Sequence, residues 1–259
     1  MTKLFDTHTH LTDQRFDGDL EALLASLPQK GVARVVDVAC HVRDAEKTLE
    51  LANKYDFIYA SVGMHPHEAA ETAAHHLEEE ARIIKANKKM VALGEIGLDY
   101  HYDFSPRPIQ RKWFCEQLDL AQQLDVPVIF HIREAFGDCM DILRERRGRF
   151  RGVMHCYSGS METAYECLDM GLYIAFGGAV TFHNAVKQAD MAARLPLDRL
   201  VIETDCPYMT PAPFRGKRTD PSMARLVAEK IASLRGVSVE SIASVTYENG
   251  ISLFEMERD

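Results

Sequence analysis

The chain has 259 residues, of which 46% are hydrophobic and 27% are charged. This composition excludes disordered, collagen-like and low-complexity proteins, because it supplies enough apolar side chains for a large core. The formal charge of −9, from 30 basic and 39 acidic residues, argues against a broad basic groove that follows many phosphates. It leaves room for a local site that holds one nucleotide or one chain end.

The same survey bears on where the protein works. No apolar run approaches the roughly 18 residues that cross a bilayer, and the N-terminal MTKLFDTHTH lacks the apolar stretch of a signal peptide. Six cysteines occur without a CxxC pair or a regular spacing, so neither a disulfide framework nor a four-cysteine zinc site is indicated. We therefore expect a cytoplasmic protein, with no membrane association and no obligate protein partner.

Short β-branched runs alternate with longer segments of helical periodicity along the chain. The predicted strands are 4–7, 33–39, 57–62, 90–94, 126–131, 152–155, 172–176 and 200–204. The predicted helices are 20–29, 44–54, 75–87, 109–124, 137–146, 160–170, 184–195 and 221–234. Eight β/α units with short links predict parallel strands joined by helical crossovers.

Two architectures with parallel strands, a doubly wound sheet and a closed barrel, are consistent with this alternation of strands and helices. A doubly wound sheet usually carries a glycine-rich phosphate loop after its first strand. Here the first strand runs into HTHL, and the chain has neither a GxGxxG motif nor a P-loop. Eight units in about 250 residues match a closed (β/α)8 TIM barrel better. Because no linker or shift of composition interrupts the series, we expect residues 1–259 to form one barrel domain.

In such a barrel, functional side chains lie at the carboxyl ends of the strands. His8 and His10 close the first strand, and alternate residues share a face, so both imidazoles can reach one metal ion. Two solvated histidines are the alternative. Glu95 follows the fourth strand among apolar residues and glycines, where burying an unpaired carboxylate is costly. A metal ion would relieve that cost, and so would an arginine partner.

Three more strands end in the same kind of residue. The fifth and sixth end at His131 and His155, and the eighth delivers Glu203 and Asp205. Each histidine alone could be an ordinary core residue. Imidazoles or carboxylates end five strands that share one rim, however, and a separate structural reason for each of them is improbable. Four histidines with two carboxylates suit two divalent ions, and ligand softness favours Zn, Mn, Co or Ni over Mg. The sequence therefore predicts a metal cluster.

Ordered motifs along almost the whole chain carry a family resemblance: FDTHTHL, VGMHPH, GEIGLDY, HIREA, HCYSGS, ETDCPY, RGKR and ENGISLF. They resemble those of the TatD-type metal-dependent hydrolases, a branch of the amidohydrolase-like barrels. The resemblance implies two divalent metal ions, with Zn, Mn and Mg as candidates. It assigns His8, His10, Glu95 and Asp205 to one ion and Glu95, His131 and His155 to the other, so that Glu95 bridges the pair.

The resemblance also implies an activity. Members of this family are mostly described as deoxyribonucleases that act on DNA ends, and some relatives act on D-aminoacyl-tRNA. We therefore expect a DNA exonuclease whose substrate is single-stranded DNA or a chain end. Glu95 and Asp205 are the expected catalytic residues, because Asp205 could orient a metal-activated water and accept its proton. Two alternatives stay open: a hydrolase of ester or cyclic amide bonds with the same metal centre, and a non-catalytic binding barrel.

Substrate phosphates need positive partners besides the metals. Arg133 after the fifth strand and Arg215 after the eighth lie on the predicted rim, where a guanidinium suits phosphate; ordinary surface charge is the alternative. His65 in GMHPH is a further candidate for a phosphate contact or a metal ligand. Thr219 and Asp220 follow RGKR where relatives usually have Asn and Glu, which predicts altered contacts near the substrate.

Overall fold

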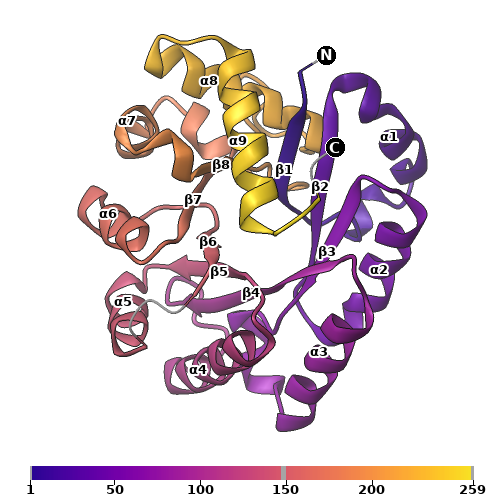
Figure 1. The fold of residues 1–259 in the computed structure, drawn as a ribbon, viewed down its shortest axis with the longest axis vertical. Coiled ribbons are helices and arrows are strands. Elements are labelled where there is room, and N and C mark those ends of the chain that lie inside the picture. Colours follow the sequence, from indigo (N-terminus) through magenta and orange to yellow (C-terminus); the bar gives the residue numbers. More distant parts are fainter. Residues whose placement is uncertain (1, 147–149, 258–259) are drawn as a thin grey trace.

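The computed structural model describes residues 2–146 and 150–257. Within them, eight parallel strands pair in sequence order, from β1 beside β2 to β7 beside β8, and helices surround them (Figure 1). The strands are β1 Leu4–Thr9, β2 Val32–Ala39, β3 Ile58–Val62, β4 Met90–Asp99, β5 Val128–Arg133, β6 Gly152–Met154, β7 Tyr173–Phe176 and β8 Leu200–Ile202. The predicted (β/α)8 barrel is confirmed.

The helices of the described residues are α1 Leu20–Ser26, α2 Ala45–Lys54, α3 Ala74–Ala86, α4 Arg107–Leu124, α5 Phe136–Glu145, α6 Met161–Asp169, α7 Val186–Arg194, α8 Ala224–Arg235 and α9 Val239–Leu253. The first eight match the predicted helices, with ends that shift by at most three residues. Helix α9 is additional, and the hydroxyl of Ser238 caps it by accepting the amide of Ser241 at 3.1 Å. None of these helices is both long and apolar enough to span a membrane.

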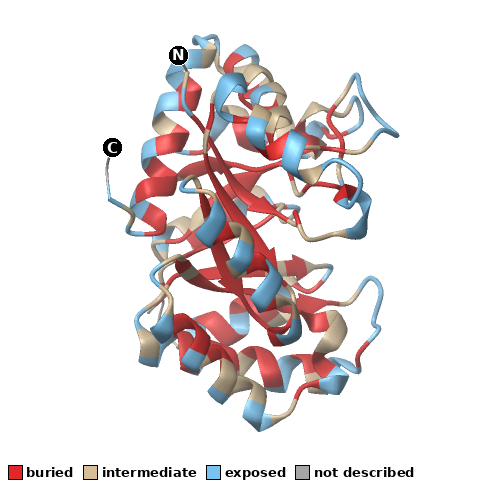
Figure 2. Ribbon diagram, turned by 90° about the vertical axis from the view of Figure 1, so that its right-hand side faces the viewer, coloured by how far each residue is buried: buried red, intermediate tan, exposed pale blue. Residues whose placement is uncertain are grey.

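The apolar core has two parts. The larger part lies between the strands and the surrounding helices, so the strands are buried while the outer faces of the helices are exposed (Figure 2). The smaller part fills the barrel, where Phe5 of β1, Val36 of β2 and Ala92 of β4 form a cluster with Tyr247 and Ile251 of α9. Helix α9 therefore covers the amino-terminal end of the barrel, and the carboxyl end is left for the site.

The first and last strands meet at their carboxyl ends and close the barrel. The amide of Asp205 donates to the carbonyl of His8 at 3.0 Å, and the amide of His10 donates to the carbonyl of Cys206 at 2.8 Å. These hydrogen bonds join segments that lie about 200 residues apart in the chain. We call residues 8–10 and 205–206 the seam of the barrel.

Candidate metal centre

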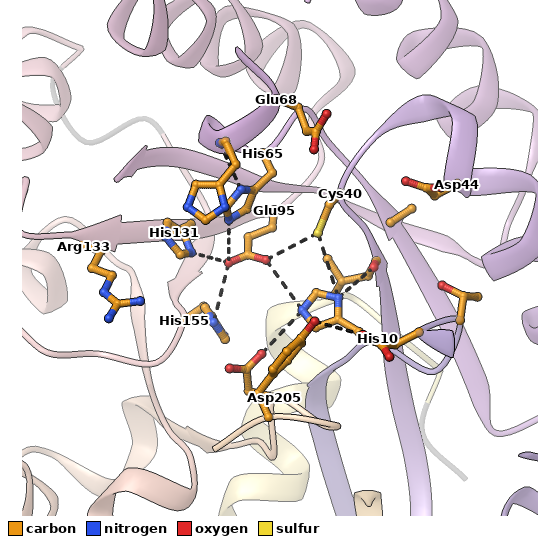
Figure 3. Close-up of a pocket in the computed structure, with 16 residues that line it drawn as sticks. His10, Cys40, Asp44, His65, Glu68, Glu95, His131, Arg133, His155 and Asp205 are labelled. Carbon is orange, nitrogen blue, oxygen red and sulfur yellow. Dashed lines mark hydrogen bonds and ion pairs between the residues drawn. The ribbon is translucent and has the colours of Figure 1, made fainter. Parts of the chain in front are cut away.

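The side chains that the sequence singles out as metal ligands gather at the carboxyl end of the barrel, and Figure 3 shows all of them except His8. They are His8, His10, Glu95, His131, His155 and Asp205. Five of them line a cavity of about 460 Å³, and His8 is buried behind it. Strands β1, β4 and β5 run further than predicted, so some of these residues lie within strands rather than after them.

Glu95 lies at the centre of this cluster. Its Oε2 is 3.4 Å from Nε2 of His8 and 3.9 Å from Nε2 of His10. Its Oε1 is 2.6 Å from Nδ1 of His131 and 3.6 Å from Nε2 of His155. Each carboxylate oxygen thus faces a different pair of histidines. Burial opposes the charged form, but the histidines outweigh it and hold the pKa of Glu95 well below its usual value.

The local backbone explains why Glu95 points into the barrel mouth. The ladder between β4 and β5 skips from Gly94 to Ile96, so Glu95 is the extra residue of a bulge. The strands also approach closely here. At Gly97, φ is 153°, and a Cβ atom would lie 1.9 Å from the carbonyl oxygen of His131, so only glycine fits.

Two further carboxylates hold the histidines of β5 and β6. Asp99 Oδ2 is 3.0 Å from Nε2 of His131, and Glu203 Oε2 is 3.1 Å from Nδ1 of His155. Both carboxylates are buried, and such partners fix which ring nitrogen faces a metal. Burial lowers the pKa of His155, but Glu203 and Glu95 outweigh it and raise the pKa to about 9. The sequence placed Glu203 on the rim, whereas the role of Asp99 was not anticipated.

Asp205 is the more accessible of the two central carboxylates. Its side chain is 16% exposed against 3% for Glu95, and its Oδ1 is 3.5 Å from Nε2 of His10. Asp205 is the third residue after the short strand β8 and has a φ of 57°, a left-handed conformation that aspartate tolerates better than most residues. Burial would raise the pKa of Asp205, but His10 and the other nearby histidines lower it, so the carboxylate is ionised at neutral pH.

The structure brings two of the three predicted substrate contacts to the cavity. His65, just after β3, has its Nε2 3.8 Å from Oε1 of Glu95. Arg133 is the last residue of β5 rather than a loop residue, and it lines the cavity. Arg215 instead lies in an exposed loop, with its guanidinium 3.7 Å from the centre of the Phe182 ring, and it is not part of the described lining of the cavity.

Thr219 and Asp220, the two departures from the family pattern, form hydrogen bonds within the loop after β8. The buried hydroxyl of Thr219 donates to that of Thr210 at 2.8 Å. The carboxylate of Asp220 accepts the amide of Ser222 at 2.9 Å and caps a short helical turn. Neither side chain is among the described lining of the cavity, so both substitutions bear on loop structure.

Two cavity residues were not singled out as functional from the sequence. Cys40 directly follows β2, and its Sγ is 4.0 Å from Oε2 of Glu95; its position at a strand end was the available signal. His67 lies in a 3-10 turn after β3, and its Nε2 is 2.9 Å from Oδ2 of Asp99. No strand-end rule points to His67, because it reaches the cavity through the path of a loop.

The donor set fits divalent metal ions. Among the described residues, five sets of donor atoms each lie within 4.8 Å of one another, and three of them consist of predicted ligands alone: His8, His10 and Glu95; Glu95, His131 and His155; and His8, His155 and Asp205. The Nε2 atoms of His8 and His10 are only 3.2 Å apart. Two neutral imidazoles can share one proton between such atoms, whereas a metal ion satisfies both lone pairs.

Comparisons with known proteins agree with this geometry. The model of the family described as TatD related DNase matches residues 5–255. A metal-dependent hydrolase of Bacillus subtilis, YabD, whose own function is uncharacterised, is 45% identical over 98% of this chain and 99% of its own length. The 3′–5′ ssDNA/RNA exonuclease TatD of Salmonella typhimurium is 30% identical over 98% of this chain and 99% of its own length.

A solved structure agrees as well. The TatD homologue YjjV of Escherichia coli superposes with a TM-score of 0.92 and 33% identity, covering 99% of both chains. The sequence resemblance, the barrel and the clustered donors therefore have one explanation. The chain belongs to the TatD-related DNase family and is a metal-dependent hydrolase.

Proposed function

We propose that this protein is a cytoplasmic exonuclease that hydrolyses phosphodiester bonds at the ends of single-stranded DNA. The observation that carries the proposal is the position of Glu95, whose two oxygens face two separate pairs of histidines. This is the arrangement expected of a carboxylate that bridges two metal ions. The exonuclease name of the Salmonella relative supports a nucleic acid as the substrate.

The residues present divide into two ligand sets. We assign His8, His10, Glu95 and Asp205 to one divalent ion and Glu95, His131 and His155 to the other. A mixture of imidazole and carboxylate donors suits Zn or Mn, and Mg less well. Asp99 and Glu203 support the second set by holding the far ring nitrogens of its histidines.

Divalent ions held by these residues would make a water molecule nucleophilic near neutral pH and would neutralise charge that develops on the phosphate. Asp205 is the group that orients this water and takes its proton. It is an ionised carboxylate beside the cavity, whereas Glu95 is almost fully buried. A general base must lie within hydrogen-bond reach of the proton that it accepts, and the opening of Asp205 to the cavity provides that reach.

The chain also provides a cation and a hydrogen-bonding imidazole for the substrate. Arg133 is the cation, whereas burial holds the pKa of His65 well below its usual value and leaves that ring neutral. Arg133 and His65 both flank Glu95 and its histidines (Figure 3). A guanidinium can hold two phosphate oxygens at once, so Arg133 orients the scissile phosphodiester. His65 adds a hydrogen bond on its own side of the cluster.

A second cavity favours one alternative function. It has a volume of about 250 Å³, shares His131, His155 and Asp205 with the metal centre, and includes the apolar side chains of Ile132 and Phe176 in its lining. An acyl group would fit such a lining as well as a nucleobase. This favours a hydrolase of ester or cyclic amide bonds, including D-aminoacyl-tRNA deacylation, as the second candidate.

End-labelled single-stranded DNA and metal-stripped protein provide the test, with Mg, Mn and Zn added back separately. We expect metal-dependent shortening by the wild type and a loss of at least about 10³-fold in the Glu95→Ala variant, with an unchanged circular dichroism spectrum. Turnover retained by the variant with metals present would refute the role of Glu95. Turnover of lactones, cyclic amides or D-aminoacyl-tRNA, with intact DNA, would establish the second candidate instead.

A further inference from the structure

Two exposed aromatic side chains lie together on the loop that joins β4 to α4. Tyr102 is 48% exposed and Phe104 is 67% exposed. Their ring centres are 5.2 Å apart, and the rings are within 14° of parallel. Single exposed apolar residues are common on protein surfaces and need no explanation. Two aromatic rings stacked on each other beside the central cavity are a different case, because clustered exposed apolar groups mark binding sites. We call Tyr102 and Phe104 the aromatic pair.

The aromatic pair is continuous with the wall of the central cavity. His67, which lines that cavity, packs edge-on with its ring centre 4.8 Å from that of Phe104 and 5.5 Å from that of Tyr102. Arg133 lines the cavity as well, and its guanidinium lies 4.7 Å from the centre of the Tyr102 ring. The pair therefore contacts two residues that a substrate in the cavity would meet.

The loop is also fixed relative to the metal centre. The backbone amide of Tyr102 donates to Oδ1 of Asp99 at 2.9 Å, and Oδ2 of the same carboxylate lies 3.0 Å from Nε2 of His131. One buried carboxylate thus positions both the aromatic pair and a histidine assigned to the metals. A ligand on the pair and a phosphodiester at the metals would be held at a constant separation.

We propose that the aromatic pair stacks on a nucleobase beside the scissile phosphodiester, with Phe104 as the main contact. The inference rests on the proposed nuclease function. Proteins that bind single-stranded nucleic acid without reading its sequence combine aromatic faces for the bases with cations for the phosphates. Phe104 and Tyr102 beside Arg133 reproduce that combination, and they lie next to a centre suited to phosphodiester cleavage.

The charge of the molecule makes this contact important. A net charge of −9 disfavours affinity gained along many phosphates, so stacking must supply part of the binding energy.

A stable protein partner would need roughly 800 Å² on each side, far more than two rings offer. A base already stacked inside a duplex cannot lie on Phe104 as well, so the contact also favours unpaired ends.

The test compares the Phe104→Ala variant with the wild type on two substrates, with a divalent metal added to each assay. One is a single-stranded oligonucleotide, and the other is the same oligonucleotide with three base-free tetrahydrofuran residues at the attacked end. We expect Phe104→Ala to raise KM for the complete substrate about tenfold, equivalent to about 1.4 kcal/mol, with little change in kcat. KM for the base-free substrate should stay unchanged, and Phe104→Trp should restore the wild-type KM. Tyr165→Ala, at an exposed aromatic residue on α6, is the control.

Other outcomes separate the two proposals. An equal loss on both substrates would mean that Phe104 only supports the loop, and no loss on the complete substrate would mean that no base lies there; either result overturns the inference and leaves the nuclease function intact. If the wild type cleaves neither oligonucleotide with any metal, the nuclease function itself fails and the stacking role fails with it.

Discussion

Glu203 acts on the metal centre through His155. Its Oε2 lies 3.1 Å from Nδ1 of His155, and its Oε1 accepts the backbone amide of Cys156 at 2.7 Å. The second bond ties the carboxylate to the segment that carries the histidine, so the ring has one orientation. A carboxylate behind a ligating imidazole also makes that imidazole a stronger donor. Glu203 is therefore a positioning residue.

Glu203→Gln tests this role with a side chain of the same shape but no charge. We expect metal affinity to fall by about 10- to 100-fold, because the amide supports the imidazole less well, while the barrel stays folded. Titration of metal-free protein with Mn or Zn in a calorimeter measures the change. Glu162→Gln, at an exposed position on α6, is the control, and equal affinities for both variants would contradict the role.

At the scale of one element, α3 carries a buried carboxyl group on its inner face. Glu80 is fully buried, and neither carboxylate oxygen has a hydrogen bond among the described residues. Burial raises its pKa to about 8. The group is therefore mostly protonated in the folded protein at neutral pH, and mostly ionised in the unfolded chain.

This pKa predicts how the stability of the fold depends on pH. Because the folded state holds a proton that the unfolded state has released above pH 4.5, the free energy of unfolding falls as pH rises toward 8. From pH 6 to pH 8 the loss due to Glu80 is about 2 kcal/mol. Glu80→Gln removes it, so the stability gained by the variant should grow by that amount across this range in urea unfolding. A gain that does not vary with pH would contradict the assignment.

At the scale of the whole molecule, the sequence predicted the alternation of strands and helices and the side chains at the strand ends. It predicted the contacts made by the loops less fully. Periods of apolar residues report strands and helices, and strand ends report which residues share a rim, so the barrel and its clustered donors were predictable. The contacts of Asp99 and His67 were not, because they depend on loop paths between distant segments. Helix α9 was missed since it follows α8 across only three residues, outside the β/α repeat.

Metal binding should stabilise the whole barrel, since the assigned ligands come from five strands or strand ends. A ligand present at 1,000 times its Kd adds about 4 kcal/mol to the folded state, and in a protein of this size about 2–4 °C of Tm accompanies each kcal/mol. We expect metal-stripped protein to regain roughly 10 °C on addition of Mn or Zn in scanning calorimetry. In Glu95→Ala the gain should be much smaller, and an equal gain would place the bound ions elsewhere.

The seam has a consequence for the order in which a working enzyme comes into being. His8 and His10 leave the ribosome early, whereas Asp205, which completes their ligand set, is made about 200 residues later. At a translation rate of about 5–20 residues per second, Asp205 is synthesised some 10–40 s after the two histidines. Because the seam joins residues 8–10 to residues 205–206, every nascent or truncated chain that stops before the eighth strand lacks an assigned ligand and the proposed base. The proposed activity therefore cannot arise before the eighth strand and Asp205 have been translated.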